Sequence, residues 1–155
     1  MKFNIYSFGR AKYHFLVEGE LEYLKRLRSE CKVNLIELES HESSSASPAV
    51  IKLHERQALF ERIKDNDFLV VLDENGQGYS SAAFAEFIKK CFDRGISVLN
   101  FAIGGPEGWD AAVLQRADVR LSLSPMTFTS QIARFILVEQ LYRALRIIKG
   151  GAYPR

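Results

Sequence analysis

Apolar residues follow two different periods along this chain, and the two periods alternate. Five short runs are almost continuously apolar, as the buried strands of a parallel sheet are, and they cover residues 2–8, 33–38, 68–72, 96–103 and 119–123. Between the runs, apolar residues recur every three or four positions, which is the period of amphipathic helices. This alternation predicts an α/β fold, with a mostly parallel sheet of five to six strands and helices on both faces.

The clearest helical segment begins at Ser80 or Ser81, either of which can serve as the N-cap, and stops at Gly95. Its apolar residues recur at i, i+3, i+4, i+7 and i+8. Two earlier segments of helical period cover residues 13–27 and 49–64. Residues 41–48, which include four serines, have the composition of a turn, and we interpret them as a mobile surface loop.

The last segment of helical period, residues 130–148, is apolar over more than half of its circumference. Such a helix needs cover on more than one side, so it lies in the core, in a dimer interface, or in both. Within it, Glu139 and Arg143 are spaced to form an ion pair along the helix. Positive charge continues through Arg146 and Lys149. This cluster suits RNA phosphates, although a solvated helix end carries such charge equally well.

Composition limits the classes of function. The chain of 155 residues, with 47% hydrophobic residues, forms one domain over residues 1–155. A net charge of +2 is too small for nucleic-acid binding through charge alone. No apolar run reaches the roughly 18 residues of a membrane span. Neither the cysteines (Cys31, Cys91) nor the three histidines have the spacing of metal ligands, and no signal peptide is evident, so we expect a cytoplasmic protein without a metal.

Loops that suit ligand binding follow three of the predicted strands. Residues 104–108 (Gly-Gly-Pro-Glu-Gly) follow the fourth strand, residues 72–78 continue the third, and residues 122–129 follow the fifth. Ligands of open α/β sheets lie beyond the carboxyl ends of strands, and glycine lets them approach the backbone. Three such loops predict a crevice for an extended cofactor. Taken singly, the first is also an ordinary turn before a helix capped by Asp110, and the last a connection in which Ser130 is the N-cap.

Other cofactor and nucleophile motifs fit poorly. A nicotinamide or flavin fingerprint places its glycines after the first strand, whereas these follow the fourth. The chain also contains no P-loop, nucleophile elbow or paired-cysteine motif. Hydrolase, phosphotransferase and redox functions therefore lack their usual residues.

The order of these loops and of the last helix resembles the SPOUT class of S-adenosylmethionine-dependent RNA methyltransferases. Within that class the chain is similar to the RlmH family, which methylates a pseudouridine of large-subunit ribosomal RNA. The resemblance covers essentially the whole chain and is strongest from Ile103 to Ala144, where residues 104–108 and 139–144 match nearly letter for letter. It implies a homodimer in which each chain has a C-terminal trefoil knot.

The resemblance also implies roles for single residues. It places contacts to S-adenosylmethionine at Leu72, Gly104, Gly105, Leu123, Ser124, Pro125, Met126, Thr127, Phe128 and Thr129. It implies that Tyr153, Arg155 and Arg143 act in catalysis, and that Arg134, Arg146 and Lys149 contact RNA.

The chain departs from the family pattern at two histidines. Before the last helix it has Thr127-Phe128-Thr129-Ser130 where the family has Thr-hydrophobic-Pro-His, and it ends in Tyr153-Pro154-Arg155 rather than Tyr-His-Arg or Tyr-His-Lys. Methylating a ring nitrogen requires removal of its proton, for which histidine is a natural acceptor. Since no histidine follows His54, Tyr153, Glu139 or a water molecule would take the proton.

We therefore expect S-adenosylmethionine-dependent methylation of large-subunit ribosomal RNA at N3 of a pseudouridine. The expected partners are ribosomal RNA or the assembled ribosome and a second copy of the chain, with no membrane and no DNA. Two alternatives remain open. One is a family member that binds the cofactor but has lost catalysis and serves as a ribosome-binding or assembly factor. The other is a methyltransferase for another RNA.

Overall fold

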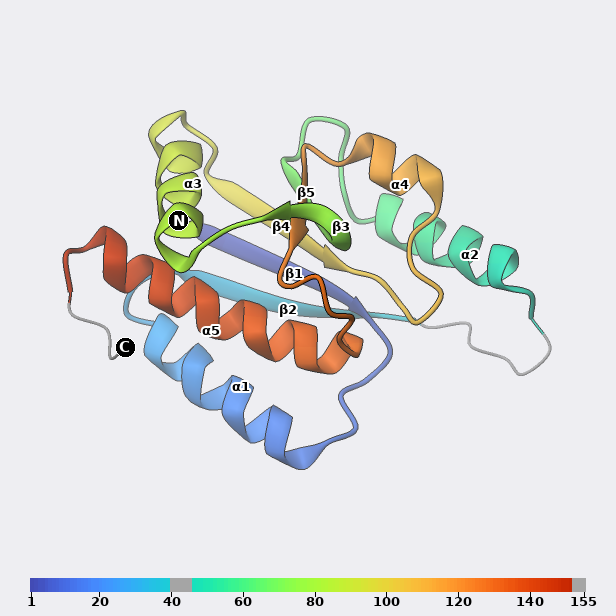
Figure 1. Cartoon of the computed structure of the whole chain (residues 1–155), viewed down its shortest axis with the longest axis horizontal. Helices are drawn as coiled ribbons and strands as arrows, with labels where there is room; N and C mark the ends of the chain where they lie inside the picture. The colour runs from blue at the N-terminus through green and yellow to red at the C-terminus, as the bar shows by residue number, and fades with distance from the viewer. Residues whose placement is uncertain (40–45, 152–155) are drawn as a thin grey trace.

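Parallel strands form the centre of the fold in the computed structural model, which describes residues 1–39 and 46–151. Within these residues five strands lie in the order β2-β1-β4-β3-β5, and every neighbouring pair is parallel (Figure 1). They are β1 (Lys2–Phe8), β2 (Lys32–Leu38), β3 (Leu69–Gly78), β4 (Val98–Ile103) and β5 (Val119–Ser122). The predicted parallel α/β sheet is confirmed.

Each predicted helix is present, and four of the helices begin at a side-chain cap. The helices are α1 (His14–Leu27), α2 (Pro48–Phe60), α3 (Ser81–Asp93), α4 (Ala111–Arg116) and α5 (Ser130–Ile148). The caps of α2 to α5 are Ser47, Ser80, Asp110 and Thr129, each accepting a hydrogen bond from an amide in the first turn. The prediction of Ser130 as the last N-cap is wrong, because Thr129 takes that position. Helix α2 ends at Phe60, earlier than the predicted boundary at Lys64.

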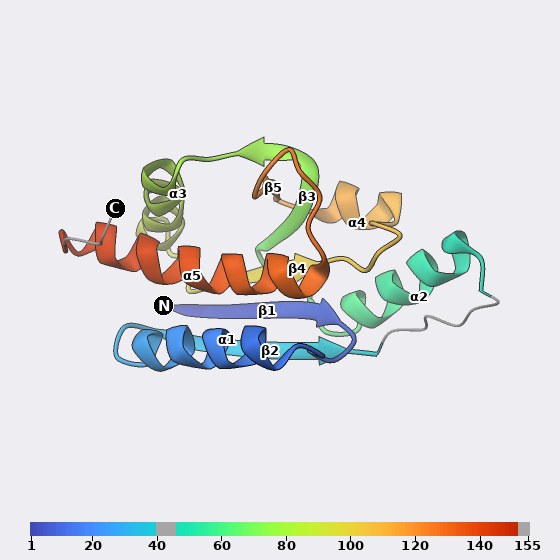
Figure 2. The same cartoon turned by 60° about the horizontal axis from the view of Figure 1, so that its bottom comes forward.

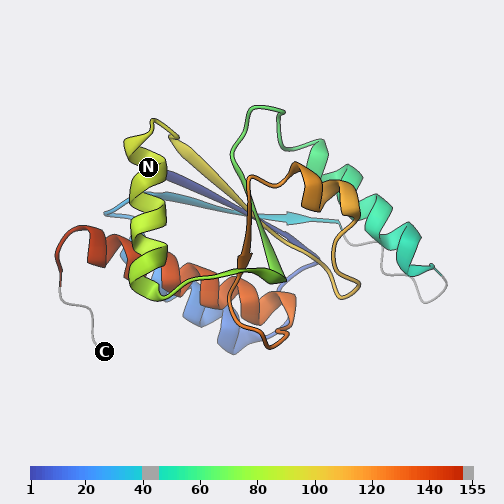
Figure 3. The ribbon, with the colours of Figure 1, turned by 45° about the horizontal axis from the view of Figure 1, so that its top comes forward.

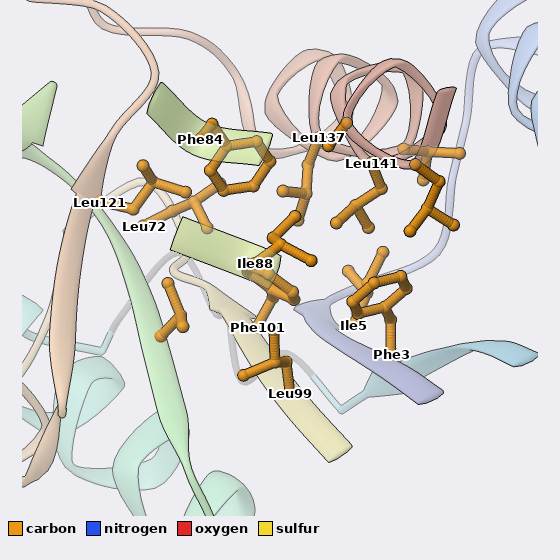
Figure 4. Packing of buried hydrophobic residues seen from close by; sticks show 14 of the residues in the cluster. Phe3, Ile5, Leu72, Phe84, Ile88, Leu99, Phe101, Leu121, Leu137 and Leu141 are labelled. Atoms are coloured by element: carbon orange, nitrogen blue, oxygen red, sulfur yellow. The ribbon is translucent and has the colours of Figure 1, made fainter. Parts of the chain in front are cut away.

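Helices cover both faces of the sheet, and each face has its own apolar core. On one face α1, α3 and α5 enclose the larger core, in which Phe101 of β4 and Ile88 of α3 meet Leu137 and Leu141 of α5 (Figure 4). On the other face α2 and α4 enclose a smaller core that includes Leu59 and Val113. Figure 3 shows α2 and α4 side by side, apart from α1 and α5. Strands buried on both sides explain the nearly continuous apolar runs in the sequence.

Helix α5 packs against both α1 and α3 as well as the sheet, which explains its wide apolar surface. In Figure 2 the end of β3 crosses over α5 to reach α3, so α5 runs between that crossing and the sheet. The predicted trefoil knot fits this arrangement and stays a prediction. Helix α5 still exposes Ile132 and Ile147, and no described helix is long and apolar enough to cross a membrane.

Two regions named by the sequence analysis fall outside the described residues. Most of the loop predicted over residues 41–48 belongs to the gap at 40–45, and Tyr153 and Arg155 belong to the end of the chain at 152–155. Their predicted roles stay predictions.

Candidate functional site

β4 and β5 end level with Leu72 of β3, and this brings the three predicted loops together. Leu72 of β3 is paired with Ile103 of β4 on one side and with Leu121 of β5 on the other. Gly104 and Ser122, the next residues along their strands, therefore flank the point where β3 leaves the main sheet. Since ligands of parallel sheets bind beyond the carboxyl ends of strands, this edge is the candidate site.

A cavity of about 200 Å³ opens beside the ends of β3 and β5, on the face covered by α3 and α5. Two hydrogen bonds order its polar rim: Ser81 donates to the Gln140 side chain (2.8 Å), and Ser122 donates to the Ser124 carbonyl (3.0 Å). Burial raises the pKa of Tyr79, another lining residue, and keeps its hydroxyl protonated. The lining residues are Tyr79, Ser81, Phe84, Leu121, Ser122, Leu123, Ile136 and Gln140.

The glycine turn after β4 lies next to side chains from elsewhere in the chain. A Cβ at Gly104 would lie 3.0 Å from the indole of Trp109, and one at Gly105 would lie 2.2 Å from the Glu55 carboxylate. The Trp109 Nε1 donates to the Leu72 carbonyl (2.9 Å), and the Gly105 amide donates to Glu55 Oε2 (3.2 Å). The glycines permit a close approach, here by groups of this chain, and the predicted approach of a ligand stays a prediction.

Trp109 and Glu55 are site residues that the sequence analysis did not select. Glu55 is 1% exposed and comes from α2, fifty residues before the amide that it contacts. Nothing in its local sequence distinguishes it from the other charged residues of α2. For Trp109 a signal did exist, since it directly follows the glycine turn and is the single tryptophan of the chain.

The second half of β3, residues 73–78, is held against β5 and against the loop that follows β5. Thr127 donates a hydrogen bond to the Glu74 carboxylate, and Arg120 forms a 2.6 Å ion pair with Asp73. Gly76 allows the crossing, because a Cβ there would lie 2.6 Å from the Arg120 carbonyl carbon. The structure thus joins residues 73–78 to β5 and to the predicted cofactor loop, residues 123–129. The sequence did not reveal these contacts.

The three arginines predicted to act in catalysis or RNA binding on α5 have different environments. Arg143, 27% exposed in its side chain, pairs with Glu139 at 2.8 Å, as the sequence spacing allowed. Arg134 is 4% exposed and donates to both oxygens of Glu20 (2.7 and 2.9 Å) and to Glu37 (3.1 Å). Arg146 lies beside the backbone of Gly151 near the end of the described chain.

Burial lowers the pKa of Arg134, but hydrogen bonds and charges from Glu20 and Glu37 outweigh this and raise it. Its guanidinium is committed to partners inside the chain. The expected RNA contact of Arg134 does not fit this position, because a phosphate would have to displace the buried Glu20 carboxylate. Of the predicted RNA contacts, Arg146 and Lys149 stand near the surface at the end of α5, where Lys149 pairs with Glu30.

The sequence of the whole chain agrees with one known family. The family model described as "Predicted SPOUT methyltransferase" matches residues 1–153. This chain belongs to the SPOUT methyltransferase family. It is 41% identical over 159 aligned positions to Ribosomal RNA large subunit methyltransferase H of Acetivibrio thermocellus, with 100% of both chains covered. It is 37% identical over 153 positions to the protein of the same name from Cytophaga hutchinsonii, with 99% of both chains covered.

Membership in the SPOUT family confirms the predicted resemblance. SPOUT methyltransferases generally use S-adenosylmethionine, which agrees with loops at the ends of parallel strands. At the position where the RlmH pattern has histidine before the last helix, this chain has Ser130, the first residue of α5. The preceding Thr129 accepts a hydrogen bond from the Ile132 amide, so this segment serves as a helix cap.

Within the described residues, no group of three or more His, Cys, Asp or Glu side chains could hold a metal ion. The two cysteines are free thiols, and burial raises the pKa of the Cys31 thiol to about 11. A thiol with that pKa stays protonated at neutral pH, so Cys31 is a poor nucleophile and a poor metal ligand.

Proposed function

We propose that this protein transfers a methyl group from S-adenosylmethionine to large-subunit ribosomal RNA, at N3 of a pseudouridine. The observation that carries the proposal is the match, over the full length of the chain, to relatives named Ribosomal RNA large subunit methyltransferase H. Agreement over 99 to 100% of both chains supports the proposal, because the alignment leaves out almost no part of either chain. We place the enzyme in the cytoplasm, where ribosomal RNA is found.

The backbone groups at the ends of β3, β4 and β5 suit the binding of S-adenosylmethionine. The Leu72 carbonyl, the Gly104-Gly105 backbone and the loop from Leu123 to Thr129 would hold it. S-adenosylmethionine supplies a methyl group on a positively charged sulfur, ready for direct attack by a ring nitrogen. The cavity of about 200 Å³ is smaller than the roughly 300 Å³ at the lower end of ligand sites, so the cofactor also needs the space over the glycine turn.

The chain's own contribution is to place the nucleotide and to stabilise the anion left after its proton is removed. Arg143 is suited to the second task, because its ion pair with Glu139 fixes the guanidinium on α5. Glu139 also accepts a hydrogen bond from Gln140 at 2.6 Å, so we assign it to positioning Arg143. Tyr153 or a water molecule then takes the proton, and Arg155 adds positive charge to the ring. Positioning the two reactants supplies much of the remaining acceleration.

RNA binding and dimer formation complete the proposal. Arg146 and Lys149 lie at the end of α5 and would contact phosphates. Helices α1 and α5 pack together and expose Phe15, Leu21 and Ile132. Exposed apolar side chains on adjacent helices suit a symmetric contact with a second copy, and the homodimer would bring basic residues of both copies to one RNA.

A second candidate function follows from the absent histidines. If Tyr153 or water cannot take the proton, the chain would bind the cofactor without turnover and act as a ribosome-binding or assembly factor. The threonine cap at the start of α5 favours this alternative, because it gives a structural role to the segment where the family pattern has its histidine.

Nucleoside mass spectrometry on ribosomes from a strain that lacks its own enzyme tests both candidates. Wild-type protein supplied with S-adenosylmethionine should form 3-methylpseudouridine, whereas Arg155→Ala should not. Cofactor binding without any product on ribosomes would favour the assembly factor. A methylated nucleoside in another RNA, with ribosomal RNA unmodified, would favour the methyltransferase for a different substrate.

A further inference from the structure

The indole of Trp109 occupies two of the backbone positions proposed for the cofactor. Its Nε1 donates a 2.9 Å hydrogen bond to the Leu72 carbonyl. Its ring atoms lie 3.0 to 3.3 Å from the point where a Cβ on Gly104 would stand, so the ring rests against the bare glycine backbone. The indole also makes an edge-on contact with Phe8, with ring centroids 6.0 Å apart.

An adenine ring would make the same two kinds of contact. It is flat and aromatic, and its exocyclic amino group is an N–H donor for a backbone carbonyl. Backbone groups at strand ends combined with glycine are well suited to a ring of this kind, because no side chain keeps it at a distance. The indole and an adenine ring cannot both lie against Gly104, since each would fill the same space.

We propose that the Trp109 indole occupies the place of the adenine ring in the free protein, and that S-adenosylmethionine binds by displacing the indole from Leu72 and Gly104. This inference rests on the proposed function. Trp109 thereby sets the affinity of the site, because each binding event has to break the indole contacts before adenine makes its own. It also keeps the Leu72 carbonyl and the glycine turn covered between turnovers.

The position of Trp109 in the chain allows this movement. It lies in the connection between β4 and α4, directly after Gly108, whose φ of +74° suits glycine. The next residue, Asp110, caps α4 through the Ala112 amide at 2.8 Å and also pairs with Arg56. The α4 end of the connection is therefore anchored, while the partly buried indole is held by one hydrogen bond, its ring contact with Phe8 and packing against the edge of the smaller core. Rotation of this one side chain would free the space against Gly104 that the indole now fills.

The experiment uses the fact that the chain contains a single tryptophan, so its fluorescence reports on this site alone. The full-length protein is titrated with S-adenosylhomocysteine, followed by calorimetry and by emission with excitation at the indole band. Binding should shift the emission to longer wavelength as the indole enters water. 5′-Methylthioadenosine should give the same shift, because it carries the adenine ring, whereas methionine should not.

Variants distinguish an indole that the adenine ring displaces from an indole that forms part of the cofactor site. Trp109→Phe removes the hydrogen-bond donor and should bind S-adenosylhomocysteine about three- to tenfold more tightly, since a competing hydrogen bond of ordinary strength is gone. Phe60→Ala, a partly exposed aromatic on α2, is the matched control and should bind like wild type. Circular dichroism and urea unfolding establish that each variant is folded.

Three outcomes would overturn the inference. Weaker binding by Trp109→Phe would make the indole part of the cofactor site, and unchanged emission at saturation would mean that it does not move. In both cases the cofactor still binds, so the proposed function survives. Absence of binding heat with wild type and with Trp109→Phe would remove the cofactor itself, and both proposals would fail together.

Discussion

Two arginines on the same helix, nine positions apart, show how burial separates structure from function. Arg134 and Arg143 both pair with glutamate, but the exposed fractions of their side chains are 5% and 27%. Arg134 joins parts of the chain that are distant in sequence, because its partners lie on α1 (Glu20), β1 (Ser7) and β2 (Glu37). Glu139, which pairs with Arg143, is in contrast one turn away on the same helix.

The difference in burial decides which charged groups on α5 a substrate can reach. A buried ion pair costs desolvation on both sides, and its geometry has to satisfy nearly every donor and acceptor. Arg134 meets that condition with three acceptor side chains, so it fixes the start of α5 against α1 and the sheet. The Arg143 pair is intrahelical and partly solvated, so it contributes little to the fold and leaves the guanidinium near water. We therefore assign Arg134 to stability, while the exposure of Arg143 is compatible with its proposed role in chemistry.

The largest effect is expected from removing the buried charge. Arg134→Met leaves Glu20, which is 3% exposed, without its main partner and should lower the free energy of unfolding by about 3–5 kcal/mol. Urea unfolding at neutral pH measures this. The double change Arg134→Met with Glu20→Leu removes the stranded carboxylate and should recover much of the loss. A single variant that loses less than about 1 kcal/mol would contradict the structural role of Arg134.

Arg143→Met should leave the stability nearly unchanged and lower the methylation rate. Its free energy of unfolding should change by no more than about 1 kcal/mol, because the lost ion pair is partly solvated. The methylation rate on ribosomes should fall by about 10²–10³-fold, since the variant lacks a group that stabilises the ring anion. Arg143→Lys keeps the charge but loses the planar fork, and its rate should lie between the two. A rate that is unaffected by Arg143→Met would remove this arginine from the mechanism.

A smaller effect is expected at the carboxylate that holds Arg143. Glu139→Gln keeps the shape of the side chain but loses the charge, and should slow methylation about tenfold, as expected for a weakened charged hydrogen bond. The loss should be in kcat with KM unchanged, because we propose that Glu139 acts by positioning Arg143 rather than by binding RNA. A rise in KM alone would instead place Glu139 at the RNA surface.

The smallest effect is expected at an exposed pair of the same i, i+4 spacing. Lys89 and Asp93 on α3 form a salt bridge at 2.5 Å, with about half of each side chain exposed. Lys89→Ala should leave both the urea midpoint and the methylation rate within experimental error, since salt and water screen such pairs. A clear loss of stability here would mean that burial is not what separates Arg134 from Arg143.

The sequence predicted the bounds of a helix or strand well where those bounds depend on residues close together in the chain. Helix α5 was predicted over residues 130–148 and found over Ser130–Ile148, because its apolar period and its helix-forming residues are readable within the segment. Strand β3 runs on to Gly78, beyond the predicted end at Leu72. The extension comes from Gln77 and Gly78, which pair with β5 after an irregularity in register, and no local pattern carries that information.

The candidate site was predicted at the level of loops rather than side chains. The sequence placed three loops at the ends of adjacent strands, and the pairing of Leu72 with Ile103 and Leu121 brings them together. Family resemblance named Arg134 as an RNA contact, but its burial depends on α1, β1 and β2 closing around it. The spacing of charges along α5 cannot distinguish a buried arginine from a solvated one.

The sequence by itself determined the order of strands and helices, their approximate bounds, the glycine turn and the family. These depend on periods of two to four residues, on caps and turns, and on motifs that lie within short segments. Only the tertiary structure decided that Trp109 reaches the Leu72 carbonyl, 37 residues away, and that Glu55 meets the Gly105 amide, 50 residues away. Such contacts depend on how the parallel strands are ordered in the sheet, because this order brings distant segments to the same edge.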